Sequence, residues 1–310
     1  MNVTTELLTV FQRKERFLLL VHYSPDGDAI ASSLGLYLVL RSLSKTVDVV
    51  CADDVPAQFA FLPAAQCIKR DFLLGDYDVV VTLDCGDSRR TGFARRLKDI
   101  VRQKKMTLVN IDHHPKNDLH DLATYNYIDF TAPSTSYLVC QLARQLGVSI
   151  NHKMATCFLT GLYTDTGGFK HPNTTPVALH FASELLSYGA RLRDITTNIT
   201  QPSSVTRLKL WGMVLGRIQR HPRYDIVITY VTADDLAKVG ACEDDIAGIA
   251  ALLGTIPAQV SVLVVRMHDG RTQVRMRTKH ASVNLVPLVS YLGGGGQKKA
   301  AGFSLVTQGK

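Results

Sequence analysis

The chain has 310 residues, of which 46% are hydrophobic and 20% charged, enough to bury one large or two medium cores. No apolar run is long enough to cross a bilayer, and the first residues lack the basic-then-apolar order of a signal peptide, so we expect a cytoplasmic protein. The six scattered cysteines form no CxxC pair, which argues against a disulfide framework or a zinc cluster. The net charge of +8 is compatible with an anionic partner but does not identify one.

Short apolar runs alternate with amphipathic segments in the first half of the chain. Strand-like runs cover 17–21, 47–51, 78–83 and 107–111, and helical spacing covers 29–43 and 90–103. This alternation predicts an α/β fold with a doubly wound parallel sheet. From about 134 to 190 the pattern is mostly helical.

A change in the pattern of polar and apolar residues divides the chain. The polar segment 191–215 contains a Pro-Ser-Ser break and is the predicted linker between a domain over 1–190 and a smaller α/β domain over 216–310. In the second domain, 224–232 reads as a strand, and Asp269-Gly270 predicts the turn of a hairpin.

Acidic and imidazole side chains follow the predicted strands of the first half. A single Asp in such a position is usually a turn or cap residue, but several in succession at one edge of a sheet predict a shared site. Because grouped carboxylates repel one another, they need cations; carboxylate and imidazole donors together suit manganese, magnesium or a similar ion. The candidate residues are His22, Asp26, Asp28, Asp84, Asp112, His113, His114 and Asp165.

These residues carry a resemblance to the DHH phosphoesterase family. His22-x-x-x-Asp26-x-Asp28 matches the first family motif, Asp84 the second, the triplet Asp112-His113-His114 the third, and Asp165 in TDTGGF the fourth. Near the end of the chain, GGGGQKKAAGF (293–303) is similar to the signature of the DHHA1 domain that accompanies one branch of the family. The resemblance implies an active site in the cleft between the two domains.

The resemblance also implies roles for the metal-site residues. His22, Asp26 and Asp84 would hold one divalent cation, and Asp28, Asp84, His113 and Asp165 the other, with Asp84 bridging. We expect manganese, with magnesium or cobalt as alternatives. His114 would face the substrate phosphate and act with Asp84 in catalysis, while Asp112 would support the site from behind.

The glycine run 293–296 predicts a backbone nest for phosphate, the alternative being a flexible loop. Arg275 and Arg277 lie two apart on a predicted strand, so both face one side and are expected to clamp phosphate. Gln297 departs from the family signature, which usually has His there. The candidate substrate-binding residues are Arg275, Arg277, Gly294, Gly295, Gly296, Gln297, Lys298, Ala301 and Gly302.

The branch that the chain resembles comprises nanoRNases and pAp phosphatases, which implies hydrolysis of short oligoribonucleotides to mononucleotides and of pAp to AMP. The alternative within the superfamily is a phosphodiesterase for cyclic di-AMP or linear pApA. A more distant alternative is a non-catalytic nucleotide-binding protein, which Gln297 would explain. The implied partners are short RNA or a small nucleotide and a second copy of the chain, with no membrane partner.

Overall fold

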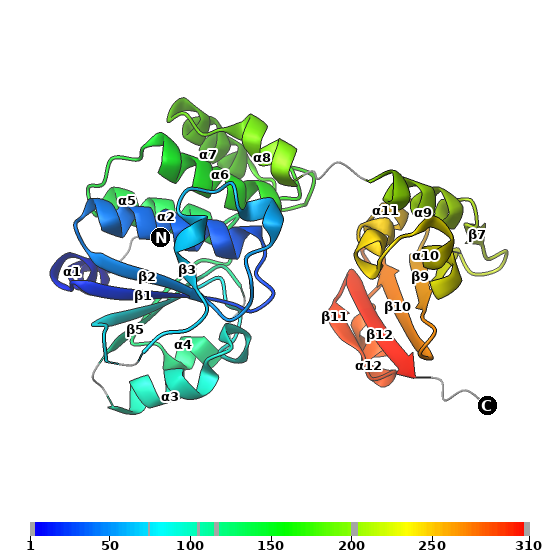
Figure 1. The fold of residues 1–310 in the computed structure, drawn as a ribbon, viewed down its shortest axis with the longest axis horizontal. Coiled ribbons are helices and arrows are strands. Elements are labelled where there is room, and N and C mark those ends of the chain that lie inside the picture. The colour runs from blue at the N-terminus through cyan, green and yellow to red at the C-terminus, as the bar shows by residue number, and fades with distance from the viewer. Residues whose placement is uncertain (1–3, 74, 104–105, 115–117, 200–203, 307–310) are drawn as a thin grey trace. The chain divides into compact units, whose positions relative to one another are not determined.

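A computed structural model describes residues 4–73, 75–103, 106–114, 118–199 and 204–306 (Figure 1). The chain divides into two compact units, residues 1–201 (unit 1) and 202–310 (unit 2). Within the described residues, every helix is too short or too polar to cross a bilayer.

Unit 1 contains a six-stranded parallel sheet, which confirms the predicted fold class. The strand order is β3-β2-β1-β4-β5-β6, so the direction of winding reverses between β1 and β4. The two outermost strands are short and escaped prediction. The strands are β1 (Arg16–Val21), β2 (Thr46–Cys51), β3 (Ile68–Lys69), β4 (Val79–Leu83), β5 (Thr107–Asp112) and β6 (Tyr125–Ile128).

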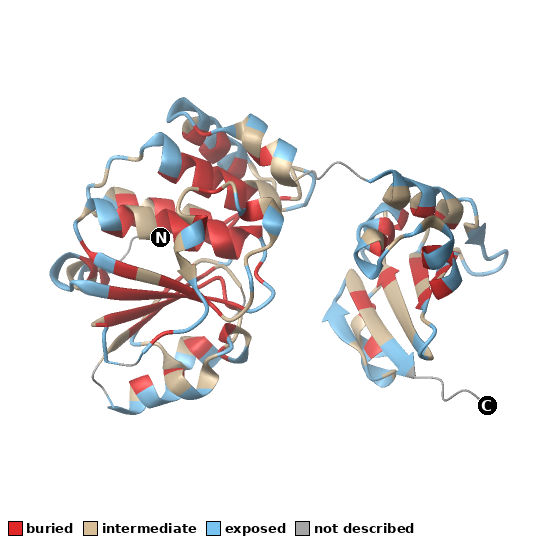
Figure 2. Cartoon of the chain, in the orientation of Figure 1, coloured by how far each residue is buried: buried red, intermediate tan, exposed pale blue. Residues whose placement is uncertain are grey.

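Helices cover both faces of this sheet (Figure 1). In β1, Leu19 and Val21 join the larger core beneath α2, α5 and α6, whereas Leu18 and Leu20 join a smaller core on the opposite face with α3. Burial on both faces explains why the central strands read as continuous apolar runs and are buried apart from Arg16 at the start of β1 (Figure 2). The helices are α1 (Thr5–Arg13), α2 (Gly27–Ser42), α3 (Ala94–Gln103), α4 (Asp118–Leu122), α5 (Thr135–Gln145), α6 (His152–Asp165), α7 (Pro176–Ser187) and α8 (Leu192–Ile199).

Close packing of α2 against α6 fixes the relative positions of two parts of the candidate site. A Cβ atom on Gly35 of α2 would collide with the Phe158 ring of α6, and one on Gly161 would collide with Asp28 and Ser136. These glycines therefore let the two helices approach closely. As a result, the beginning of α2, which carries Asp28, lies beside the end of α6.

Unit 2 contains a mixed six-stranded sheet of order β11-β12-β10-β9-β8-β7, in which only the β8–β9 pair is parallel. The predicted hairpin at Asp269-Gly270 joins β9 to β10. The strands are β7 (Gln219–Arg220), β8 (Ile226–Thr232), β9 (Val260–Arg266), β10 (Arg271–Arg277), β11 (Gly295–Gln297) and β12 (Ala300–Val306); the helices are α9 (Val205–Leu215), α10 (Ala233–Val239), α11 (Ile249–Leu253) and α12 (Val286–Tyr291).

The predicted linker 191–215 is mostly helical. Ile195 of α8 is buried in the core of unit 1, and Leu210 of α9 is buried in the core of unit 2. Ile195 anchors α8, whereas Leu210 and Val214 anchor α9. The boundary between the units, at 201/202, falls within the predicted segment; Pro202 and Ser203 lie outside the described residues.

The α2–α6 contact generates a prediction about stability. Because a methyl group at Gly35 has no space, Gly35→Ala should lower the free energy of unfolding by about 1–3 kcal/mol. Gly212 in α9 is a matched control, since a Cβ there meets no atom within 4 Å. Gly212→Ala should raise stability by about 1 kcal/mol through helix propensity. Scanning calorimetry of the two variants tests this, and equal shifts in the same direction would contradict it.

A second prediction concerns pH. The Arg217 guanidinium forms a bidentate pair with the buried Asp235 carboxylate at 2.6 and 2.7 Å and lowers the pKa of Asp235 to about 2. Because the folded pKa lies below the unfolded value, the pair stabilises unit 2 above about pH 4, and this stabilisation is lost as pH falls towards 2. Allowing for solvent screening at the partly exposed Arg217, we expect a loss of about 1–2 kcal/mol.

The measurement is denaturant unfolding at several pH values, followed by the fluorescence of Trp211, the only tryptophan of the chain and a residue that packs on the unit 2 core. Asp235→Asn should be less stable at neutral pH and should lose this part of the pH dependence. An unchanged slope between pH 4 and 2 in the variant would contradict the prediction.

Candidate metal centre

The candidate residues of unit 1 gather at the carboxyl ends of three adjacent parallel strands. His22 follows β1, Asp84 follows β4, and Asp112 ends β5. The strand order reverses between β1 and β4, and ligands of open α/β sheets bind at such a reversal. The topology thus brings together residues that are up to 90 positions apart in the chain.

The loop between β1 and α2 presents His22 and Asp26. The His22 ring is buried, and its Nδ1 lies 2.7 Å from the Tyr23 carbonyl oxygen, so Nδ1–H donates there and Nε2 carries the lone pair of the ring. This Nε2 lies 3.7 Å from Asp26 Oδ2. Asp26 is also the N-cap of α2 and accepts a hydrogen bond from Ala29 N–H. The cap therefore holds the Asp26 carboxylate beside Nε2 of His22.

Asp28 is buried at the point where α2 meets the beginning of α5. Its carboxylate accepts hydrogen bonds from the backbone N–H groups of Thr135 (2.6 Å) and Ser136 (3.1 Å). These are first-turn donors with no partner inside the helix, and the positive end of a helix dipole favours an anion. Burial nevertheless raises the pKa of Asp28.

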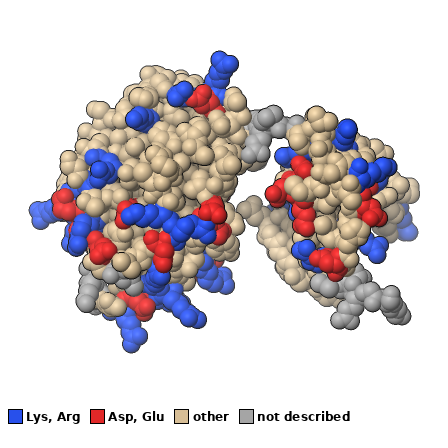
Figure 3. Space-filling view, viewed as in Figure 1, with Lys and Arg blue, Asp and Glu red and all other residues tan. Residues whose placement is uncertain are grey.

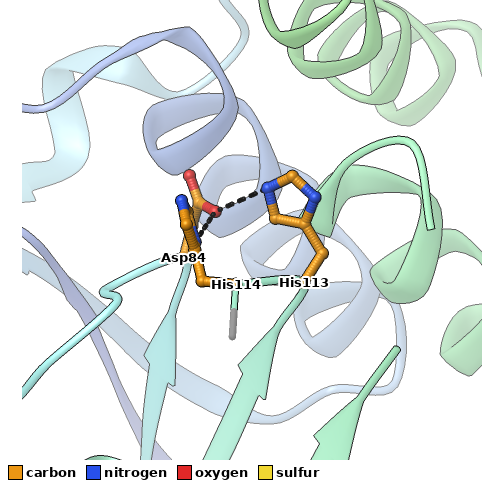
Figure 4. A group of neighbouring side chains, drawn as sticks. All are labelled: Asp84, His113 and His114. Carbon is orange, nitrogen blue, oxygen red and sulfur yellow. Dashed lines mark ion pairs between the residues drawn. The ribbon is translucent and has the colours of Figure 1, made fainter. Parts of the chain in front are cut away.

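Asp84 lies at the centre of the group (Figure 4). Its backbone has a left-handed φ of 57°, which is uncommon for a residue other than glycine, and its carboxylate accepts a hydrogen bond from the Thr135 hydroxyl at 2.9 Å. The same carboxylate oxygen lies 3.5 Å from His113 Nε2 and 3.4 Å from His114 Nδ1. Burial, followed by the nearby carboxylate of Asp28, raises the pKa of Asp84 well above its usual range.

Asp112 orients His114 rather than joining the central group. One carboxylate oxygen accepts hydrogen bonds from the backbone N–H of His114 (2.9 Å) and from its Nδ1 (2.7 Å), and the other accepts one from Gly86 N–H. The hydrogen bond with Asp112 raises the pKa of His114 and leaves Nε2 of that ring available. Asp112 is fully buried, whereas the His114 ring is partly exposed.

Asp165, the last residue of α6, completes the site. His113 Nε2 lies 3.6 Å from Asp165 Oδ2, and Asn173 Nδ2 donates to the same oxygen at 3.4 Å. Burial, followed by the charge of Asp28, raises the pKa of Asp165 to about 7. A cation close to Asp165 would reverse this effect.

The donor atoms form three groups in which all ligand atoms lie within 4.8 Å of one another. Asp28 and Asp84 are buried, and no Lys or Arg of the described residues forms an ion pair with the carboxylates of the site, so a divalent cation would neutralise their negative charge. Oxygen and imidazole donors also fit such an ion. The groups are His22, Asp26 and Asp84; Asp28, His113 and Asp165; and Asp84, His113 and His114.

The structure adds three polar residues to the predicted site: Thr135, Ser136 and Asn173 hydrogen-bond to its carboxylates. Arg90, which with Arg89 follows Asp84 and is expected from the sequence to reach a phosphate or to cap the next helix, contacts His22. In the sequence, 133–139 reads only as a helix start; Ser134 is the N-cap, and the two residues after it contact the site. That a helix begins beside Asp28, 107 residues earlier, is not visible in local sequence.

The glycine run of unit 2, predicted as a backbone nest for phosphate, lies partly in an edge strand. Gly295, Gly296 and Gln297 form the edge strand β11, which pairs with β12. A Cβ atom on Gly294 or Gly296 would collide with the backbone of β12. The close approach that glycine indicated in the sequence is therefore made by the chain's own backbone.

The candidate substrate-binding residues of unit 2 are nevertheless neighbours. Arg275 pairs with Gly302, which pairs with Gly295; Arg277 pairs with Ala300, which pairs with Gln297. Directly opposed residues in antiparallel strands face the same side, so Gln297 shares a face with both arginines.

A surface groove of about 380 Å³ lies on unit 2, where Arg275, Gly294 and Gly302 contribute to its lining. Ala301 is buried, and Lys298 is exposed. The neighbouring Lys299 donates to the His280 and Val283 carbonyl groups, so it is occupied within the unit.

Comparison with known proteins agrees with this geometry. Residues 16–162 match the DHH family, N-terminal domain. The chain is 32% identical, over 92% of its length and 82% of the relative's, to the bifunctional oligoribonuclease and PAP phosphatase NrnA of Thermus thermophilus. It is 25% identical, over 97% of its length and 93% of the relative's, to the protein of the same name from Bacillus subtilis.

A solved structure extends the similarity to the fold of both units. The exopolyphosphatase-related protein of Bacteroides fragilis is 27% identical and aligns with a TM-score of 0.84, over 98% of this chain and 91% of the other. The match of nearly the full length, together with the gathered aspartates and histidines, settles the assignment: the chain belongs to the DHH family of phosphoesterases.

Proposed function

We propose that the protein is a manganese-dependent phosphodiesterase that releases mononucleotides from short oligoribonucleotides and removes phosphate from pAp. The observation that carries this proposal is the set of donor groups built around the buried Asp84. The names of the Thermus and Bacillus relatives supply the substrate class. On the face shown in Figure 3, Lys and Arg alternate with Asp and Glu, which fits a short substrate better than a long polyanion.

The donor set fits two divalent cations: His22, Asp26 and Asp84 would hold one, and Asp28, His113 and Asp165, together with Asp84, would hold the other. When bound, such cations neutralise the developing charge on phosphoryl oxygens and lower the pKa of an attacking water. The protein's own part is to hold these donors rigidly through the α5 N-terminus, the Thr135 hydroxyl and Asn173.

His114 is the group we assign to proton transfer. Its Nδ1 is hydrogen-bonded to Asp112, which orients the ring and raises its pKa, so its Nε2–H can donate. Water attacks phosphorus, the bond from phosphorus to the leaving nucleoside oxygen breaks, and His114 gives its proton to that oxygen. Asp112 acts only by positioning the ring.

The first prediction for this function concerns Asp84→Asn. The amide keeps the size of the side chain and can still accept from Thr135, but it removes a buried charge close to Asp28. We expect the melting temperature of the metal-free variant to equal or exceed that of the wild type, its stabilisation by Mn²⁺ to be lost, and hydrolysis to fall at least about a hundred-fold. Thermal shift assays and release of mononucleotides from a labelled RNA trimer measure these effects.

Asp99→Asn is the control, because Asp99 is exposed on α3. It should behave as the wild type. An Asp84→Asn variant that keeps both its stabilisation by Mn²⁺ and its activity would rule out the proposed centre. If the wild type binds Mn²⁺ but hydrolyses pApA or cyclic di-AMP in place of the RNA trimer and pAp, the alternative substrate class is correct.

The second prediction concerns Gln297, which stands where the family signature has His. Gln297→His adds a side chain that carries positive charge below about pH 6.5. We expect the ratio of kcat/KM for pAp to that for an RNA dimer to change about tenfold at pH 6, and the change to disappear by pH 8. Gln219→His, on the opposite edge of the same sheet, is the matched control. If the ratio of the two kcat/KM values is the same in both variants as in the wild type, Gln297 does not contact the substrate.

A further inference from the structure

Arg90 lies against the metal centre without a carboxylate partner among the described residues. It belongs to the short turn that follows Asp84, and its Nη2 lies 3.1 Å from His22 Nδ1 and 3.3 Å from His22 Nε2. Its neighbour Arg89 differs: its side chain is 85% exposed and pairs with Asp87. Two adjacent arginines thus have different surroundings, and only Arg90 points to the site.

The backbone around Arg90 is held independently of its side chain. The Arg90 carbonyl accepts from Tyr23 N–H at 2.7 Å, and Arg90 N–H donates to Asp87 Oδ1 at 3.2 Å. Gly86, at a φ of 68°, leaves room for the guanidinium, since a Cβ there would lie 3.1 Å from Arg90 Nη1. The turn therefore keeps its shape when the side chain moves or is replaced.

The guanidinium lies close to the nitrogen of His22 that would bind a cation. Nδ1–H of that ring already donates to Tyr23, so Nε2 is the nitrogen with a lone pair for a metal ion. Arg90 Nη2 lies 3.3 Å from this nitrogen. A divalent cation bound there would repel the guanidinium strongly at a separation of a few ångströms. A cation bound at His22 would therefore move the Arg90 side chain away from this ring.

The side chain would remain near the centre after such a movement, because the Arg90 backbone is held by hydrogen bonds with Tyr23 and Asp87. Of the described residues, Arg90 is the one Lys or Arg that hydrogen-bonds to a residue of the predicted metal set. A planar guanidinium with free N–H donors binds two oxygens of one phosphate.

We propose that Arg90, whose guanidinium contacts His22, is a phosphate-binding residue that would clamp the non-bridging oxygens of the phosphoryl group beside the bound cations. This inference rests on the proposed phosphoesterase function. Arg90 would compete with the cation at His22 and would attract the substrate phosphate. Replacement of Arg90 therefore affects metal and phosphate in opposite directions.

The experiment uses Arg90→Gln, Arg90→Lys and the control Arg89→Gln, with the full chain. Calorimetric titration measures the affinity for Mn²⁺ alone, then the affinity of the Mn²⁺-loaded protein for inorganic phosphate. Arg90→Gln should bind Mn²⁺ as tightly as the wild type or up to about tenfold more tightly, because the competing charge is gone. It should bind phosphate about ten- to a hundred-fold more weakly, through loss of two charge-assisted hydrogen bonds.

Arg90→Lys should lie between the wild type and Arg90→Gln for phosphate, because lysine keeps the charge but not the planar fork. Arg89→Gln should match the wild type in both titrations. Unchanged phosphate affinity in Arg90→Gln would overturn the proposal, and so would a parallel loss of Mn²⁺ and phosphate affinity, the mark of a merely structural role. A wild type that binds Mn²⁺ and phosphate but does not cleave RNA would refute the proposed substrate without touching this inference.

Discussion

The architecture of unit 1 depends on one electrostatic constraint: carboxylates of like charge are buried together where parallel strands end. Asp28 and Asp84 have almost no exposed surface, and Asp165 lies within reach of the same charges. Hydrogen bonds from the beginning of α5 stabilise part of this charge, but the pKa values of all three carboxyl groups are still raised. Repulsion between these carboxylates destabilises the site, and bound cations would neutralise it.

Several features of unit 1 bring these carboxylates together. The direction of winding reverses between the neighbouring strands β1 and β4. Their carboxyl ends therefore place His22 and Asp84 side by side. Glycines at the α2–α6 contact bring the helix that carries Asp28 against the one that ends in Asp165. Asp112, below this layer, holds His114 at the rim. The carboxylates of the centre therefore lower the stability of the fold and at the same time supply the donors for cation binding.

Much of this organisation could be predicted from sequence because its signals are local. Apolar runs bounded by turns predicted the central strands, and an acid or histidine after each of them predicted which residues would meet. The short edge strands β3 and β6 escaped because two to four residues give no periodicity. Helix α8 escaped because its one buried residue, Ile195, lies within polar sequence, and α9 escaped because it directly follows the Pro-Ser-Ser break.

The contacts that sequence could not supply are those between distant segments. Thr135 reads as a helix start, and only the fold brings it beside Asp28 and Asp84. The glycine run reads as a ligand nest, because sequence does not reveal that β12 of the same chain makes the close approach. Arg89 and Arg90 are indistinguishable in the sequence. In the structure, the Arg89 side chain is exposed to solvent, whereas the Arg90 side chain contacts His22.

Anomalous diffraction at the manganese absorption edge, from crystals of the protein grown with Mn²⁺, tests the central claim most directly. The account predicts two strong peaks beside Asp84, one also contacting His22 and Asp26, the other contacting Asp28, His113 and Asp165. A map without a peak at Asp84, or with peaks only on surface carboxylates, would contradict it.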